Sequence, residues 1–144
     1  MQNNQTTCHF AVYQDVSSHI TINVRFEGDD VWLTQLQIAA LLQTSRTNIV
    51  HHIRSIYQAA ELQRERTCQY FSQVQIEGKR SVQRNIAHYN MDMIIAVGYR
   101  VRSAAATQFR QWVAERRNQI IIEKKKRYSK KISKTIKQCP NNKT

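Results

Sequence analysis

The sequence predicts an α+β fold, and two patterns in it predict that class. Segments in which apolar and polar residues alternate lie on both sides of a central stretch whose apolar residues recur at helical spacing. The expected order is N-terminal β-strands, a helix-turn-helix, a wing-like β-hairpin and C-terminal helices. A hydrophobic share of 41% over 144 residues suffices for one domain with a modest core.

Three strands are predicted ahead of the central stretch, because their residues alternate and are rich in β-branched and aromatic types. We expect them at residues 9–14, 20–26 and 31–33, with turns at 15–18 and 27–30. The third strand leads directly into a helix. Trp32 within it is expected to pack in the core rather than stack on a nucleic-acid base, since aromatic residues beside apolar runs usually do so.

Residues 34–56 predict two short helices joined by a tight turn. Thr34 and Ser45 are the expected N-caps. The second helix places three isoleucines on one face, namely Ile49, Ile53 and Ile56. Its opposite face is polar and basic and carries Arg46, Thr47, Val50, His51 and Arg54. This spacing is expected of a DNA-binding helix-turn-helix, whose second helix lies in the major groove, although Gln43 stands where such turns usually carry glycine.

A β-hairpin is predicted after the two helices, with strands at 67–76 and 81–89. Gly78 in its turn can adopt the positive φ that a hairpin loop needs. Such a hairpin resembles the wing of winged-helix proteins, and its cations can reach phosphates. The alternative is a solvated tip that only keeps the sheet edge soluble. The candidates for phosphate contact over the whole chain are Ser45, Lys79, Arg80, Arg84, Arg100 and Arg102.

Two helices are predicted after the hairpin. Asn90 or Asp92 can cap the first, and Gly98 either ends it or marks close backbone packing. Ser103 begins the second helix. Its expected core anchors are Phe109 and, three residues on, Trp112, with Val113 as the alternative to Trp112.

The positive charge is concentrated at the C-terminal end of the chain. The formal net charge is +12, and residues 115–144 contain 11 Lys and Arg against 2 acids, whereas residues 1–114 contain 11 against 8. We therefore expect a domain over residues 1–113 and a basic, partly helical or disordered tail over 114–144. Such a tail adds sequence-independent attraction to nucleic acid.

The sequence contains no pattern that requires catalysis, a cofactor or a metal. Glycine occurs only at 28, 78 and 98, so no glycine-rich phosphate loop is present. His51 and His52 are adjacent, which puts them about 100° apart on a helix and makes a shared metal unfavourable. Asp29 and Asp30 lie in a turn that favours such residues anyway. We expect a protein that is not an enzyme and that has no evident small-molecule substrate.

The cysteines and the apolar runs predict the cellular compartment of the protein. Cys8, Cys68 and Cys139 are far apart and odd in number, so they form neither a disulfide framework nor a zinc spacing. The N-terminus has no signal-peptide pattern, and the apolar runs are too short to cross a bilayer. We expect a soluble, cytoplasmic protein that does not bind membranes.

Three ordered blocks carry a family resemblance: VWLTQLQIAALL with SRTNIVHHI, then VQIEGKRSVQRNIAHYNMDMIIAVGYRV, then TQFRQW. Through them residues 11–113 resemble the N-terminal part of the bacterial virulence protein RhuM family. The last block is also similar to the end of phage antirepressor and Bro-N type domains, which are held to bind DNA. Family members are generally longer, and the part after Trp112 departs from their pattern, so a truncated or frameshifted end is expected. The resemblance implies DNA binding without naming a target.

Together these observations predict a double-stranded DNA-binding protein, a transcriptional regulator of a virulence-associated or mobile element. A second copy of the chain is an expected partner, since one small helix-turn-helix gains affinity by pairing on two half-sites. Two alternatives stay open. The domain could be a protein-interaction module of a virulence or phage system, which Val50 among polar neighbours favours. The tail could also bind nucleic acid nonspecifically by itself.

Overall fold

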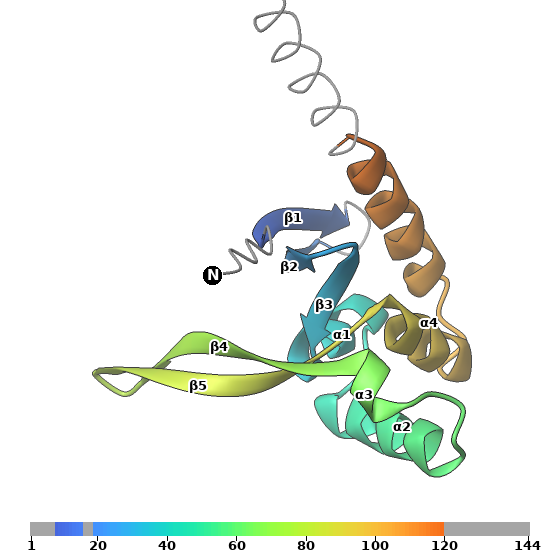
Figure 1. The fold of residues 1–144 in the computed structure, drawn as a ribbon, viewed down its shortest axis with the longest axis horizontal. Coiled ribbons are helices and arrows are strands. Elements are labelled where there is room, and N and C mark those ends of the chain that lie inside the picture. Colours follow the sequence, from blue (N-terminus) through green and yellow to red (C-terminus); the bar gives the residue numbers. More distant parts are fainter. Residues whose placement is uncertain (1–7, 16–18, 120–144) are drawn as a thin grey trace, which may run out of the picture. The chain divides into compact units, whose positions relative to one another are not determined.

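The computed structural model describes residues 8–15 and 19–119, which form an α+β fold around one antiparallel five-stranded sheet (Figure 1). The strands are β1 (His9–Asp15), β2 (Ile20–Glu27), β3 (Asp30–Thr34), β4 (Cys68–Glu77) and β5 (Arg80–Tyr89). The helices are α1 (Gln35–Leu42), α2 (Arg46–Gln58), α3 (Arg64–Thr67) and α4 (Met91–Arg100), and residues 105–119 are also helical. The chain divides into two compact units, with the boundary after Arg110. The predicted turn at 16–18 and the tail beyond 119 lie outside the described residues.

The sheet combines the predicted N-terminal meander with the predicted hairpin. Its strand order is β1-β2-β3-β5-β4, and all neighbouring strands are antiparallel. β3 joins the two parts through only two residue pairs, Leu33 with Tyr89 and Thr34 with His88. Beyond this junction β4 and β5 pair with each other alone among the described strands, and they extend as a long two-stranded arm (Figure 1). The predicted strands are confirmed, and the junction between them is new.

The core draws on both the sheet and the helices. Its largest fully buried side chains include Leu33, Ile38, Ile49, Ile56, Met93, Ile94 and Phe109. Trp32 is buried and meets the Phe71 ring edge-on at 5.8 Å between centroids, as its predicted packing role requires. Phe109 meets Tyr13 in the same way at 5.2 Å, which ties the start of the last helix to β1.

The two predicted helices of the central stretch are present with both predicted caps. The Thr34 hydroxyl accepts from the Gln37 backbone N–H at 3.2 Å, and the Gln37 side chain accepts from the Thr34 N–H at 3.0 Å, a complete capping box. Ser45 Oγ accepts from the Asn48 N–H at 3.1 Å and caps α2. Gln43 ends α1 in the left-handed conformation, at φ 54° and ψ 49°. A non-glycine residue therefore makes the turn that glycine usually makes.

The sequence pattern missed the one-turn helix α3. The Thr67 hydroxyl closes the turn by donating to the Gln63 carbonyl at 2.7 Å, and Tyr57 Oη of α2 lies 2.8 Å from the same hydroxyl, which ties the turn to α2. Since a carbonyl can only accept, the Thr67 proton is used there and Tyr57 must be the donor in the second bond. Asn90 completes the junction by donating its amide to the Arg66 carbonyl at 3.1 Å.

Several details of the C-terminal helices differ from expectation or resolve an alternative. Asn90 rather than Asp92 caps α4, accepting from the Met93 N–H at 3.3 Å. Gly98 lies inside α4, where a Cβ would come 2.4 Å from the Ala106 Cβ, so it marks close packing rather than the helix end. In the last helix Phe109 is buried as predicted. The second buried position is Val113, four residues on, and Trp112 is only half-buried, because a helical face follows the 3.6-residue period.

Candidate nucleic-acid interface

The outward face of α2 brings together all five residues predicted to read bases. They line one shallow depression, formed by Arg46, Thr47, Val50, His51 and Arg54. Four of them are exposed and Val50 is half-buried. The opposite face of the helix is buried through its isoleucines. Burial of one helical face therefore decides which side chains remain available to a ligand.

Carboxylates are absent from this part of the sequence. No acidic residue occurs between Asp30 and Glu61, so α1, the turn and α2 carry only the positive charges of Arg46 and Arg54. The N-terminal end of α2 adds the partial positive charge of its exposed backbone N–H groups. Burial lowers the pKa of His52, and the nearby His51 and Arg100 lower it further. The α2 face suits an anionic ligand because it carries two arginines and no acid.

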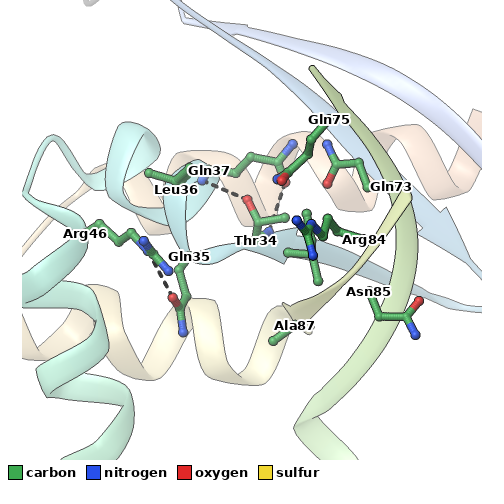
Figure 2. A pocket seen from close by; sticks show the side chains of 11 residues that line it. Thr34, Gln35, Leu36, Gln37, Arg46, Gln73, Gln75, Arg84, Asn85 and Ala87 are labelled. Atoms are coloured by element: carbon green, nitrogen blue, oxygen red, sulfur yellow. Dashed lines mark hydrogen bonds between the residues drawn. The ribbon is translucent and has the colours of Figure 1, made fainter. Parts of the chain in front are cut away.

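Arg46 also borders a second groove, which we call the arm groove (Figure 2). This groove, with a volume of about 690 Å³, lies between the first turn of α1 and the arm. It is lined by Thr34, Gln35, Leu36, Gln37, Arg46, Gln73, Gln75, Arg84, Asn85, Ile86 and Ala87. Leu36 is apolar and yet 62% exposed here. The arm groove therefore combines two cations and several amides with apolar side chains.

The cations of the arm fall into two kinds. Lys79 and Arg80 are exposed at the turn beside Gly78, whose φ is +64°. Arg84 is engaged, because its Nε and Nη2 donate to the two carboxylate oxygens of Glu77 at 3.1 Å each. Both partners are about half exposed, and an ion pair in that setting contributes about 0–1 kcal/mol. A phosphate could therefore replace Glu77 at little cost.

The structure separates two of the predicted phosphate contacts from the rest. Arg100 donates to the Glu61 carboxylate at 2.7 Å, and it lines a depression on the α4 side together with Tyr99 and Arg110. Arg102 follows α4 with a positive φ of 55° and lines a neighbouring depression. Both lie at or after the end of α4, away from the arm, and like Ser45, Lys79 and Arg80 they line neither the α2 depression nor the arm groove.

The amide side chains of the arm groove were not among the predicted site residues. Gln73 and Gln75 lie two residues apart on β4, so they share one face of the strand and both point to the groove. Gln35 and Gln37 reach it from the first turn of α1. Glutamine amides can donate and accept, as contacts to base edges require. The Gln-x-Gln spacing in a predicted strand was the available signal.

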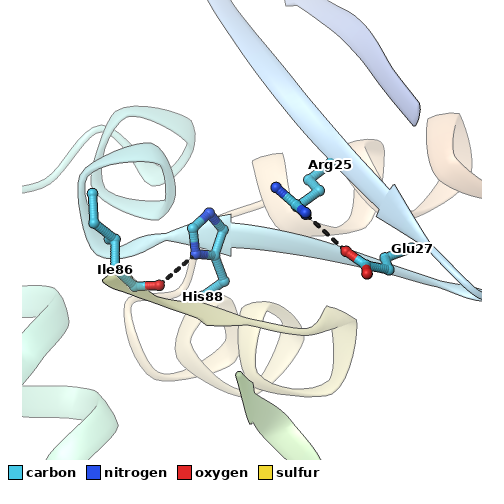
Figure 3. A network of polar contacts seen from close by, with 4 residues as sticks. All are labelled: Arg25, Glu27, Ile86 and His88. Carbon is cyan, nitrogen blue, oxygen red and sulfur yellow. Dashed lines mark hydrogen bonds and ion pairs between the residues drawn. The ribbon is translucent and has the colours of Figure 1, made fainter. Parts of the chain in front are cut away.

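The base of the arm is fixed by a buried polar contact (Figure 3). His88 Nδ1 lies 2.8 Å from the Ile86 carbonyl oxygen, and because a carbonyl only accepts, Nδ1 carries the proton. Burial lowers the pKa of His88, and the nearby Arg25 lowers it further. Arg25 pairs with Glu27 at 2.9 Å, and its guanidinium lies 4.0 Å from the centroid of the Phe71 ring. These contacts connect the arm to β2.

Among the described residues, no three His, Cys, Asp or Glu side chains come together in a way that could hold a metal ion. No helix in the described part of the chain has both the length and the apolar character needed to cross a membrane.

The fold and the site define an α+β protein with a cationic helix face next to a polar groove. The model of the virulence protein RhuM family matches residues 66–134, just under half of the chain. This match supports the assignment of the chain to the virulence protein RhuM family, as the resemblance predicted. It starts later than the resemblance did, and it continues past Trp112 to residue 134, so the expected departure from the family pattern after Trp112 is wrong. The likeness to antirepressor and Bro-N type domains stays a prediction. No curated protein and no solved structure matches the chain.

Proposed function

We propose that the protein binds double-stranded DNA, with α2 in the major groove and the arm against the phosphate backbone. On this proposal the α1-α2 pair works as a helix-turn-helix and the arm as its wing. The protein is a binding protein rather than an enzyme, and it acts in the cytoplasm as a transcriptional regulator of a virulence-associated or mobile element. Its tail strengthens binding to any sequence.

One observation carries the proposal. The residues predicted from spacing alone to read bases share a depression on the free side of α2, while the isoleucines of the same helix are buried. Arg46 and Arg54 are exposed there with no acid in either helix. An arginine can bond guanine in two places, and Thr47 and His51 offer groups of the kind that contact base edges.

Selection of bound sequences from a random duplex pool tests the proposal on the full chain. The wild-type protein should enrich a defined motif. T47A and H51A should relax that preference by about 1–3 kcal/mol for each lost base contact. Q58A serves as the matched control, because Gln58 is exposed on the same helix outside the depression. If T47A and H51A enrich the wild-type motif with unchanged preference, α2 does not read the sequence.

A second candidate function, a protein-interaction module, is favoured by the apolar side of the arm. Tyr70, Val74 and Ile76 are 63%, 60% and 83% exposed, and they share one face of β4. β4 is also the edge strand of the described sheet. Edge strands of this kind invite pairing with another chain. A second copy is the natural partner, since a homodimer would present two α2 helices to two half-sites.

Sedimentation equilibrium distinguishes the dimer from the monomer. The wild-type chain should associate, and I76K should shift the equilibrium toward monomer, because a lysine on an edge strand opposes strand pairing. A chain that stays monomeric at every concentration would exclude the homodimer and leave DNA binding by a single copy.

A further inference from the structure

We infer that the arm groove is a second nucleic-acid contact site, which binds the sugar–phosphate backbone of the strand next to the α2 face. The inference rests on the proposed function, which already includes α2 and the arm, and adds the first turn of α1 and the residues that position or compete for the two arginines. Arg46 belongs to both lining sets, so one side chain borders both the α2 depression and the arm groove. We therefore expect a duplex that contacts Arg46 on α2 to reach the groove as well.

The chemistry of the groove suits a phosphodiester backbone. Among the described residues that line it, the charged ones are Arg46 and Arg84, and both are cations. The other polar lining residues are mostly amides, which can bond sugar hydroxyls, phosphate oxygens or base edges. Figure 2 shows the two arginines on opposite sides of Thr34, one from α2 and one from the arm. Two cations at the edges and amides between them form a surface for a chain of phosphates.

Gln35 is a positioning residue for this surface. Its carbonyl oxygen accepts from Arg46 Nε at 3.2 Å, and its amide nitrogen donates to the Tyr89 hydroxyl at 3.1 Å. Tyr89 is buried at the base of the arm. Arg46 is thus oriented from the junction of β3 and β5. Because Gln35 bonds Nε, the pair of terminal nitrogens at the far end of the Arg46 guanidinium is left to contact a phosphate bidentately.

Glu77 competes with the ligand for Arg84. The ion pair uses Nε and Nη2 of the arginine, the same kind of fork that a phosphate would take. Binding of a phosphate there releases Glu77 into solvent, to which it is already half exposed. Removal of the Glu77 carboxylate should therefore raise the affinity for the nucleic acid, although an ion pair within the protein is lost.

The test measures binding of a labelled mixed-sequence duplex to the full chain at several salt concentrations. R46Q and R84Q should each reduce the slope of log affinity against log salt by about 0.9, the value for one lost phosphate contact. E77Q should raise the affinity several-fold. R110Q, which removes an exposed arginine outside the groove, is the matched control and should leave the slope close to that of the wild type. Urea unfolding of each variant verifies that the fold is retained.

A double-mutant cycle tests the role of Gln35. Q35A should weaken binding when Arg46 is present and have no effect in the R46Q background, since Gln35 acts through Arg46. Equal effects of Q35A in both backgrounds would make Gln35 a direct contact or a structural residue.

The outcomes separate the two proposals. If the salt slopes of R46Q and R84Q equal that of R110Q while T47A and H51A still relax sequence preference, the arm groove does not bind the backbone. Base reading by α2 is then still supported. If the slope falls in R46Q and R84Q but T47A and H51A change nothing, the groove is supported and base reading by α2 is overturned. A wild-type chain that binds no duplex overturns both.

Discussion

Individual side chains hold the candidate interface in place through buried or capped contacts. The capping box at Thr34 fixes where α1 begins, and Ser45 fixes where α2 begins. Gln35 then connects the first turn of α1 to both Arg46 and Tyr89. The position of Arg46 thus depends on neighbouring side chains of α1 and the base of the arm.

Gly98 provides a stability prediction at this scale. In a helix interior alanine is ordinarily better than glycine by about 1 kcal/mol. Here G98A should instead lower the free energy of unfolding by about 1–3 kcal/mol, because the new Cβ would overlap Ala106. Urea unfolding measures the change. A106G in the same chain should relieve the overlap, so the double variant should lose less than the sum of the single ones. A G98A protein as stable as the wild type would contradict the close packing.

His88 provides a prediction of pH dependence. Burial lowers its pKa in the folded chain, so the unfolded chain takes up the proton first as the pH falls. The stabilising effect of a neutral His88 is fully present above its unfolded pKa of about 6.5 and declines below it. The urea midpoint should therefore fall between about pH 7.5 and about pH 5.5, and fall less in H88Q. The same decline in both proteins would show that His88 does not contribute.

At the scale of elements, α2 and the arm differ in what they can recognise. α2 presents side chains from successive turns of one rigid helix, which suits discrimination between bases. The arm presents cations at its tip and amides along one face, which suits contacts to the backbone. Because β3 joins the arm to the rest of the sheet by two residue pairs, the arm is attached at its base beside His88 and Tyr89.

The tip of the arm should contribute affinity without specificity. Replacing Lys79 and Arg80 by glutamine should weaken binding to all duplexes alike and lower the log–log salt slope by about 0.9 per lost phosphate contact. Fluorescence anisotropy over a salt series measures both effects. R102Q removes an exposed arginine that follows α4 and does not belong to the arm, and so controls for the loss of a positive charge elsewhere. Equal slopes in R102Q and the tip variant would restrict the tip to a role in solubility.

At the scale of the whole molecule, most of the net positive charge and the residues proposed to read bases lie in different parts of the chain. Most of the net charge of +12 comes from residues 115–144, whereas the residues proposed to read bases lie in α2. Long-range attraction to a polyanion and discrimination between sequences can therefore be changed separately.

Neutralising the tail tests this separation. Replacing the Lys and Arg residues within 123–138 by glutamine should lower affinity for mixed-sequence DNA and flatten its salt dependence. The ranking of sequences enriched from a random pool should stay the same, because the α2 face is unchanged. If selective enrichment disappears with the tail charges, the tail alone is responsible and the protein is a nonspecific nucleic-acid binder.

Local signals in the sequence determined much of the fold and one part of the candidate site. The caps at Thr34 and Ser45, the isoleucine period of α2 and the glycine of the hairpin turn each depend on residues a few positions apart. Such short-range patterns persist in the folded chain because they set backbone geometry and the buried face directly. They were sufficient to predict which side of α2 stays exposed.

Only the tertiary structure decided what lies beside that face. The β3–β5 junction pairs Leu33 with Tyr89, and Gln35 bonds the same tyrosine across 54 residues of chain. The structure also decided between Trp112 and Val113, of which Val113 is buried, and it tied α3 to α2 through the bond between Tyr57 and Thr67. No local pattern encodes these contacts, because they form between segments that meet only when all five strands pair into one sheet. The arm groove results from that pairing.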